Sequence, residues 1–288
     1  MTSAVDPSPR LAFPWPKVGW FALLVGVAYI RILISLVGDW SADPDMGHGF
    51  FVPLVVGYII WQQKDELRTL RLQPNWWGLV VVFLGATQMI VATLGAELFL
   101  ARTSFVITII GVVWLLGGNA VLRRLAFPLF LLFFMVPIPA VIYNSATLKL
   151  QLLASRLAEG ALMVLDVPVL REGNVLELPN QKLSVVEACS GIRSLLSLTF
   201  LSLVYGFFTE KRIWVRVALF LSTIPIAILA NGSRVTVTGI LTQWKPELAE
   251  GFFHESTGWV IFMIALGLLI LFHQAVNRSI RLLGFKTT

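Results

Sequence analysis

A cysteine, an arginine and a histidine are the residues of this sequence with the clearest chemical use. Cys189 is the only cysteine, so it cannot form a disulfide within the chain, and it serves either apolar packing or thiolate chemistry. It lies directly before an apolar run, residues 194–208. If that run is a membrane helix, Cys189 lies at its N-terminus, where unpaired N–H groups and the helix dipole stabilise a thiolate. Cys189 is therefore a candidate nucleophile.

The composition predicts the helices that must position it. The chain has 288 residues, of which 57% are hydrophobic and 13% charged, and this is too apolar for a soluble surface. A membrane helix needs about 20 largely apolar residues. The sequence predicts an all-α polytopic membrane protein, a bundle of about eight transmembrane helices, in the segments 18–38, 50–63, 76–95, 103–118, 124–142, 191–208, 213–231 and 256–274.

The basic residues predict the orientation of these helices. With the N-terminus inside, more than half of the 22 Lys and Arg residues fall in cytoplasmic loops and tails, as the positive-inside rule requires. Residues 1–17 and 277–288 are then cytoplasmic tails of a single transmembrane domain, residues 18–276. The proline-rich start does not resemble a cleavable signal peptide. We assign the net charge of +6 to the orientation of the membrane helices. No interleaving of basic and aromatic residues suggests a nucleic-acid-binding surface.

This orientation places residues 143–188 outside the cytoplasm. Ser145 to Leu165 predicts an amphipathic helix that lies on the membrane or packs against the bundle, because charged residues interrupt an apolar stripe made of Leu148, Leu152, Leu153, Leu157 and Ala161. Val169 to Leu178 and Leu183 to Val186 predict a small β-hairpin that leads into Cys189.

The same orientation brings three side chains to one membrane surface. Cys189 begins the sixth predicted helix, the seventh ends outside at Asn231-Gly232-Ser233-Arg234, and the eighth begins outside at His254. His254 can take the thiol proton and return it to a leaving amine, while Arg234 can stabilise an oxyanion. Taken singly, Arg234 is an arginine that reaches lipid phosphate and His254 an interfacial polar residue. Their coincidence with Cys189 favours a peptidase or transpeptidase that works through an acyl-thioester.

His48 also falls on the outer surface. A zinc site made of Cys189, His48 and His254 is conceivable, but no close pair of ligands marks one, so we expect neither metal nor cofactor. His48 would instead orient the catalytic groups or bind substrate, and Asn231, Glu187 and Ser190 are further supporting or substrate-binding residues. His273 should lie at the inner end of the eighth helix, away from this site. An intramembrane serine or aspartyl protease is a weaker hypothesis, since Ser190 has no neighbouring base and no paired aspartates lie within helices.

Several motifs, in this order and spacing, resemble the exosortase/archaeosortase family of membrane cysteine transpeptidases, in particular its bacterial exosortase branch. The resemblance covers residues 40 to 275 and rests on 47–54 (GHGFFVPL), 136–140 (VPIPA), 167–174 (VPVLREGN), 186–193 (VEACSGIR), 230–235 (ANGSRV) and His254 with Gly258. It implies that Cys189 is the nucleophile, Arg234 the transition-state arginine and His254 the acid/base.

The resemblance also implies a place and a substrate. The place is the bacterial inner membrane, with the active site on the extracytoplasmic side. The substrates would be secreted proteins with a C-terminal sorting signal of the PEP-CTERM type, which has a Pro-Glu-Pro-like motif, a transmembrane helix and a basic tail. Cleavage near the motif would precede transfer to a cell-surface acceptor.

A non-enzymatic membrane transporter or scaffold of exopolysaccharide export is the alternative. It accounts for the helices and the polar outer loops, but it gives Cys189 no task. Cys189→Ala discriminates between the two functions, because only the enzyme should accumulate uncleaved substrate.

Overall fold

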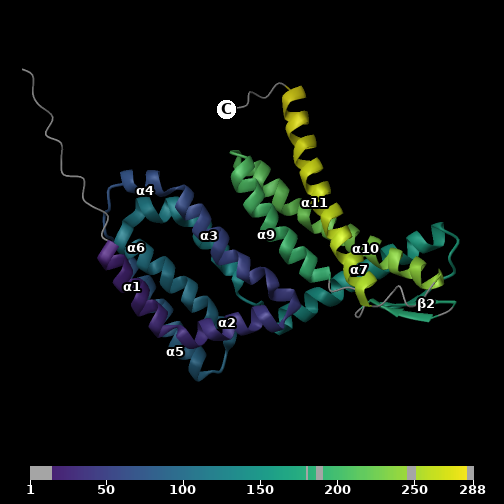
Figure 1. The fold of residues 1–288 in the computed structure, drawn as a ribbon, viewed down its shortest axis with the longest axis horizontal. Coiled ribbons are helices and arrows are strands. Elements are labelled where there is room, and N and C mark those ends of the chain that lie inside the picture. The colour runs from purple at the N-terminus through teal and green to yellow at the C-terminus, as the bar shows by residue number, and fades with distance from the viewer. Residues whose placement is uncertain (1–14, 180, 186–190, 245–250, 284–288) are drawn as a thin grey trace, which may run out of the picture. The chain divides into compact units, whose positions relative to one another are not determined.

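The computed structural model describes residues 15–179, 181–185, 191–244 and 251–283, with residues 15, 181, 191, 244 and 251–255 described by their backbone alone. The chain forms two compact units, residues 1–138 and residues 139–288 (Figure 1).

The described part of the first unit consists of helices and the loops that join them. Its elements are α1 (Trp15–Ala28), α2 (Ile30–Ala42), the 3-10 helix η1 (Pro44–Phe50), α3 (Phe51–Gln62), α4 (Lys64–Thr69), α5 (Trp77–Leu94), α6 (Leu98–Leu131) and the 3-10 helix η2 (Leu132–Met135).

Glycines bring α5 and α6 into direct contact. A Cβ atom at Gly78 would overlap the main chain of Leu115, and one at Gly111 would lie 2.6 Å from the main-chain nitrogen of Val82. Without side chains at these positions the two backbones approach closely, as membrane helices do where small residues meet. Tyr29 packs against the same pair, and its hydroxyl lies 2.7 Å from the Thr108 hydroxyl.

Helix α6 turns sharply at Gly118, whose φ of 74° is not helical. The end of α2 contacts both the first arm of α6 and η2, which continues the second arm. Asp39 forms an ion pair with Arg102, and the Trp40 indole N–H donates to the Met135 carbonyl at 2.9 Å. A straight helix would separate Arg102 from Met135 by about 50 Å, so the second arm must run back beside the first. This is the break that the sequence predicts between residues 118 and 124.

The second unit combines helices with a small sheet. Its elements are α7 (Ala140–Val164), β1 (Leu170–Glu172), β2 (Val175–Leu178), β3 (Gln181–Ser184), α9 (Gly191–Thr209), α10 (Ile213–Trp244) and α11 (Gly251–Leu282). The strands pair antiparallel in the order β1-β2-β3, with Leu178 opposite Gln181. The predicted hairpin is confirmed, and a turn at Gly173 with φ of 66° divides its first strand in two.

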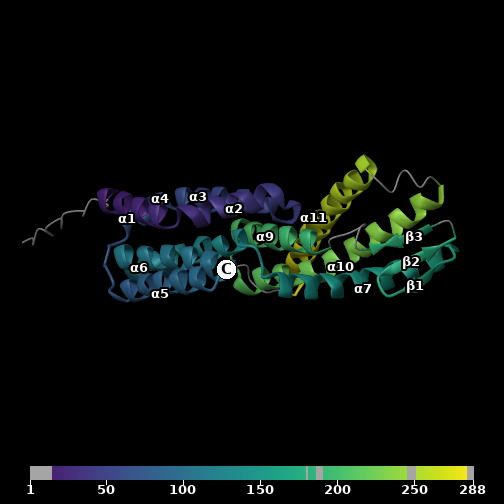
Figure 2. The same cartoon turned by 90° about the horizontal axis from the view of Figure 1, so that it is seen from below.

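The sheet packs against α7 and α10 (Figure 2). Leu176, Leu178 and Leu183 of the sheet form one buried cluster with Ala154, Ala158 and Leu162 of α7 and Val235 of α10. The buried side of α7 is therefore a small-residue face. Most of the apolar stripe is not buried there, since Leu148, Leu153 and Leu157 are 41–51% exposed, which suits contact with lipid.

Helices α9, α10 and α11 form the other core of this unit. Leu198, Leu219 and Leu269, one from each helix, are almost completely buried in it.

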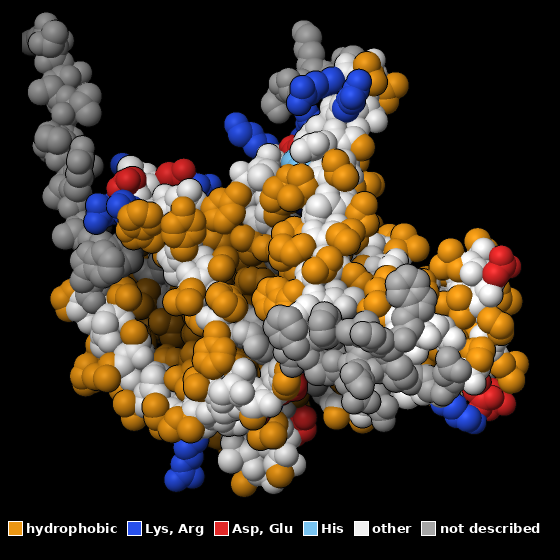
Figure 3. Space-filling view, turned by 45° about the vertical axis from the view of Figure 1, so that its right-hand side comes forward, with side chains coloured by type: hydrophobic (Ala, Val, Ile, Leu, Met, Phe, Trp, Pro, Cys, Tyr) orange, Lys and Arg blue, Asp and Glu red, His pale blue; other side chains and the backbone are white. Residues whose placement is uncertain are grey.

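Within the described residues, five helices are long and apolar enough to cross a membrane, or six if the bent pair α1 and α2 is one span. The fold is thus all-α and polytopic, as predicted, but the count of eight is not met. The predicted span 50–63 is α3, which at 12 residues is about 18 Å long and too short to cross alone. Hydrophobic side chains cover much of the surface in Figure 3, as lipid contact requires.

Candidate active site

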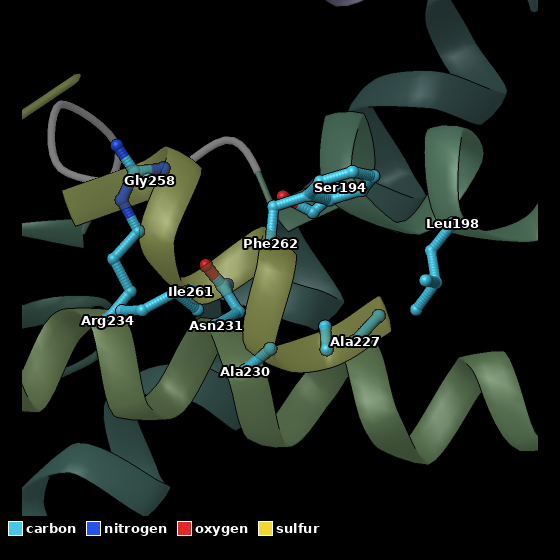
Figure 4. A pocket seen from close by; sticks show the side chains of 10 residues that line it. Ser194, Leu198, Ala227, Ala230, Asn231, Arg234, Gly258, Ile261 and Phe262 are labelled. Carbon is cyan, nitrogen blue, oxygen red and sulfur yellow. The ribbon is translucent and has the colours of Figure 1, made fainter. Parts of the chain in front are cut away.

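A small cavity lies where α9, α10 and α11 meet (Figure 4). Its volume is about 10 Å³, which is room for a single water molecule. The cavity can therefore take one polar atom or water but no whole residue. It is lined by Ser194 and Leu198 of α9, Ala227, Ala230, Asn231 and Arg234 of α10, and Gly258, Ile261, Phe262 and Ala265 of α11.

Arg234 reaches this cavity from the middle of α10. The predicted helix end at residue 231 is wrong, because α10 continues to Trp244. The continuation has a physical reason: beyond Asn231, α10 packs on protein, with Gly232 against Leu157 and Gly239 against Leu162. Arg234 is thus held on a regular helix, a more rigid base than the loop end that the sequence predicts.

The Arg234 guanidinium lies against α11 at Gly258. A Cβ atom at Gly258 would lie 3.2 Å from Arg234 Cζ and Nη2, closer than ordinary van der Waals contact. Figure 4 shows the arginine extending from α10 toward this point. Gly258 lies one helical turn after His254, so Arg234 reaches the first turns of α11.

Asn231 lies one turn before Arg234 on the same face of α10. Its side chain is only 6% exposed, and its Nδ2 has no acceptor among the described residues.

The other predicted site residues are only partly described. Cys189, Glu187 and Ser190 lie outside the described residues, in the segment that joins β3 to α9. Ser194, in the first turn of α9, lines the cavity. His254 belongs to the first turn of α11, where only the backbone is described. The three helices that carry or directly follow the predicted triad therefore converge on one cavity.

Comparison with known proteins identifies the family. A family model described as transmembrane exosortase matches residues 40–271. The chain belongs to the transmembrane exosortase family. The match runs through both units, so the exosortase region includes the first unit as well as the cavity. No curated protein and no solved structure shows significant similarity to the chain.

His48 lies in the first unit of this exosortase, in η1. Burial lowers the pKa of the imidazole below its ordinary value, against the opposing effects of hydrogen bonds to the main chain of Phe134 and Asp45 and of the Asp45 charge. Its Nδ1 is buried without a partner among the described residues. A role for His48 in orienting the catalytic groups or binding substrate stays a prediction.

No group of three or more His, Cys, Asp or Glu residues that could hold a metal ion occurs in the described part of the chain. The polar residues of the cavity, Ser194, Asn231 and Arg234, offer hydrogen-bond donors and one positive charge. Such a donor set suits an anionic or carbonyl oxygen better than a cation.

A second polar cluster lies at the other end of α9. His273 of α11 bonds the Tyr205 hydroxyl at 2.9 Å and lies 3.5 Å from Glu210. Burial acts to raise the pKa of Glu210, but hydrogen bonds from Arg212 N–H, His273 and Lys211 N–H outweigh it and lower the pKa. The sequence assigns His273 to the end of its helix away from Cys189, and these contacts agree with that position.

Proposed function

We propose that this exosortase is a membrane cysteine transpeptidase that cleaves C-terminal sorting signals of secreted proteins. The observation that carries the proposal is the convergence of α9, α10 and α11 on a cavity lined by Arg234. The start of α9 follows Cys189 and the start of α11 contains His254. A guanidinium against Gly258 is thereby close to the segment that carries the proposed base.

Each residue has a defined role in the proposed reaction. His254 takes the Cys189 proton, and the thiolate attacks the scissile carbonyl carbon, so that a C–S bond forms and the carbonyl electron pair moves to oxygen. Arg234 stabilises this oxyanion with fixed N–H donors. Collapse of the intermediate reforms the carbonyl and breaks the C–N bond, and the leaving amine takes the proton from His254. The product is an acyl-thioester on Cys189.

The second half-reaction repeats these roles. An acceptor nucleophile attacks the thioester carbonyl and gives its proton to His254. The C–S bond then breaks, which transfers the acyl group and restores the thiolate. A cell-surface acceptor gives transpeptidation, and water gives hydrolysis.

The charge distribution supports an extracytoplasmic site. In the second unit, Lys211 and Arg212 lie at the turn between α9 and α10, at the opposite end of α9 from Ser194. The path from Ser194 to Thr209 is about 22 Å of helix, most of the hydrocarbon thickness. If the basic end is cytoplasmic, the cavity lies near the outer surface of the bacterial inner membrane, and both termini lie inside.

The substrate class follows from this depth and from the family resemblance. A protein tethered by one transmembrane helix presents the residues before that helix at the outer interface. A PEP-CTERM-type signal, with its motif, helix and basic tail, has this design. Membrane lipid surrounds the enzyme and its substrate alike.

The proposal is tested by expressing a secreted protein with such a tail together with wild-type enzyme, Cys189→Ala, Arg234→Ala or His254→Ala. Wild type should release the tail, and each variant should accumulate full-length substrate while its own membrane level is unchanged. The matched control is Ser256→Ala, which removes another polar side chain from the first turns of α11 and should leave tail release unchanged. Full processing by Cys189→Ala would contradict the enzymatic function and favour the scaffold of exopolysaccharide export.

A further inference from the structure

The buried amide of Asn231 has an unused donor. The side chain is 6% exposed, and its Nδ2 has no acceptor within the described part of the chain. A buried polar group without a partner costs about 1–3 kcal/mol, so its presence in the cavity wall calls for a partner that arrives during function.

Asn231 and Arg234 lie on the same face of α10 and both line the cavity. Figure 4 shows the amide directed from α10 toward α11, between the labelled positions of Ile261 and Phe262, while the arginine extends to Gly258. Most other cavity residues are apolar, including Leu198, Ala227 and Phe262. In such surroundings a hydrogen bond to a developing negative charge is stronger than in water.

The cavity also has the right size to hold one negatively charged oxygen atom. About 10 Å³ admits a single oxygen atom or a water that later yields its place to one. A site of one-atom size whose wall carries donors from two side chains, Asn231 and Arg234, matches an oxyanion hole rather than a pocket for a substrate side chain.

We propose that Asn231 is a catalytic residue: its side-chain N–H donates a hydrogen bond, beside the Arg234 guanidinium, to the acyl oxygen that becomes an oxyanion when Cys189 attacks. This inference rests on the proposed function and adds a second donor to it.

Two small reagents separate this role from other roles of Asn231. p-Nitrophenyl acetate acetylates a thiolate through an oxyanion: the sulfur adds to the carbonyl carbon, the electron pair moves to oxygen, and collapse expels p-nitrophenolate to leave an acetyl-thioester. Iodoacetamide alkylates the same sulfur by displacing iodide, with no oxyanion. Mass spectrometry of the peptide that contains Cys189, the only cysteine, after digestion of the treated full-length protein, measures both reactions at this one residue.

The variants are Asn231→Leu, which keeps the volume without the donor, and Asn231→Ala. The matched control is Thr223→Val, also on α10 and 1% exposed, whose hydroxyl donates to the Phe220 carbonyl. We expect both Asn231 variants to lower the acetylation rate about 100-fold, the typical effect of one oxyanion donor. Their alkylation rates should stay within about twofold of wild type, and Thr223→Val should change neither rate.

An unchanged acetylation rate would overturn the proposal. A parallel fall in both rates would also overturn it, because Asn231 would then act on the thiolate or on the fold. If wild-type Cys189 is alkylated by iodoacetamide but never acetylated by the ester, the nucleophile assigned under the proposed function is itself wrong.

Discussion

Gly258→Ala should separate activity from stability, because the contact that it disturbs is made by Arg234. The added Cβ would lie 3.2 Å from Arg234 Cζ and Nη2 and 3.5 Å from Nη1. Carbon and nitrogen atoms normally keep 3.5–4.0 Å apart, so the guanidinium must withdraw by a few tenths of an ångström. The side chain can do so at little cost to the fold, because its far end is flexible.

The magnitudes follow from this displacement. A hydrogen bond to a charged group contributes about 1.5–3 kcal/mol. Losing about half of that from the transition state costs about 1.4 kcal/mol, which is about tenfold in rate. The helix itself gains, since alanine is about 1 kcal/mol more favourable than glycine in a helix interior. We therefore expect about tenfold slower cleavage and an unchanged or slightly raised melting temperature.

The assay measures tail release in membranes and thermal unfolding of the purified protein by tryptophan fluorescence. Gly267→Ala is the matched control, since a Cβ at this second α11 glycine meets nothing within 4 Å. It should give the same gain in stability with full activity. Activity of Gly258→Ala within twofold of wild type would show that the position of the Arg234 guanidinium does not control cleavage. A further loss when Gly258→Ala is added to Arg234→Ala would show that the substitution acts through another group.

Three other predictions concern stability, measured by thermal unfolding. Wild type should lose stability as the pH falls below about 6.5, because the pKa of His48 is lowered in the fold and the unfolded chain therefore binds a proton at His48 more readily. His48→Gln should remove this loss. The same pH dependence in His48→Gln and wild type would contradict the prediction. Gly78→Ala should destabilise by about 1–3 kcal/mol through its overlap with α6, whereas Gly57→Ala, in open space, should not; equal effects would exclude close α5–α6 packing. Glu210→Gln should cost about 2 kcal/mol at pH 7. Because the pKa of Glu210 is lowered in the fold, this difference should be full above the ordinary pKa of 4.5 and should shrink as the pH falls below that value and through the lowered pKa; a difference that stays constant in acid would contradict this.

Hydropathy predicts the helices that face lipid but not how protein contacts extend them. Every predicted segment overlaps a helix of the structure. The prediction that α10 ends at residue 231 is wrong. Polar residues after this position suggest a helix end, but the sequence does not show that the following turns pack on α7 and the sheet. Gly232 and Gly239 are the only local signal of that packing, since each lets a leucine of α7 approach.

The sequence indicates the convergence of the site but not its detail. Charge placement alone predicts that the start of α9, the region of Arg234 and the start of α11 lie at one membrane surface. The cavity depends on which helix faces meet, and that choice comes from packing among α9, α10 and α11. Hence the burial of Asn231 and the contact of Arg234 with Gly258 emerge only from the structure, whereas Cys189 stays a prediction from its sequence context.

The proposed function requires that Cys189 carries the substrate as a thioester during transfer, and trapping that adduct is its sharpest test. Wild-type membranes should be quenched in acid during turnover of a tailed substrate and analysed by mass spectrometry with and without hydroxylamine. We expect a hydroxylamine-sensitive acyl adduct on the peptide that contains Cys189, and Cys189→Ser should abolish both this adduct and tail release. Continued tail release by Cys189→Ser, with no adduct in wild type, would show that Cys189 is not the nucleophile.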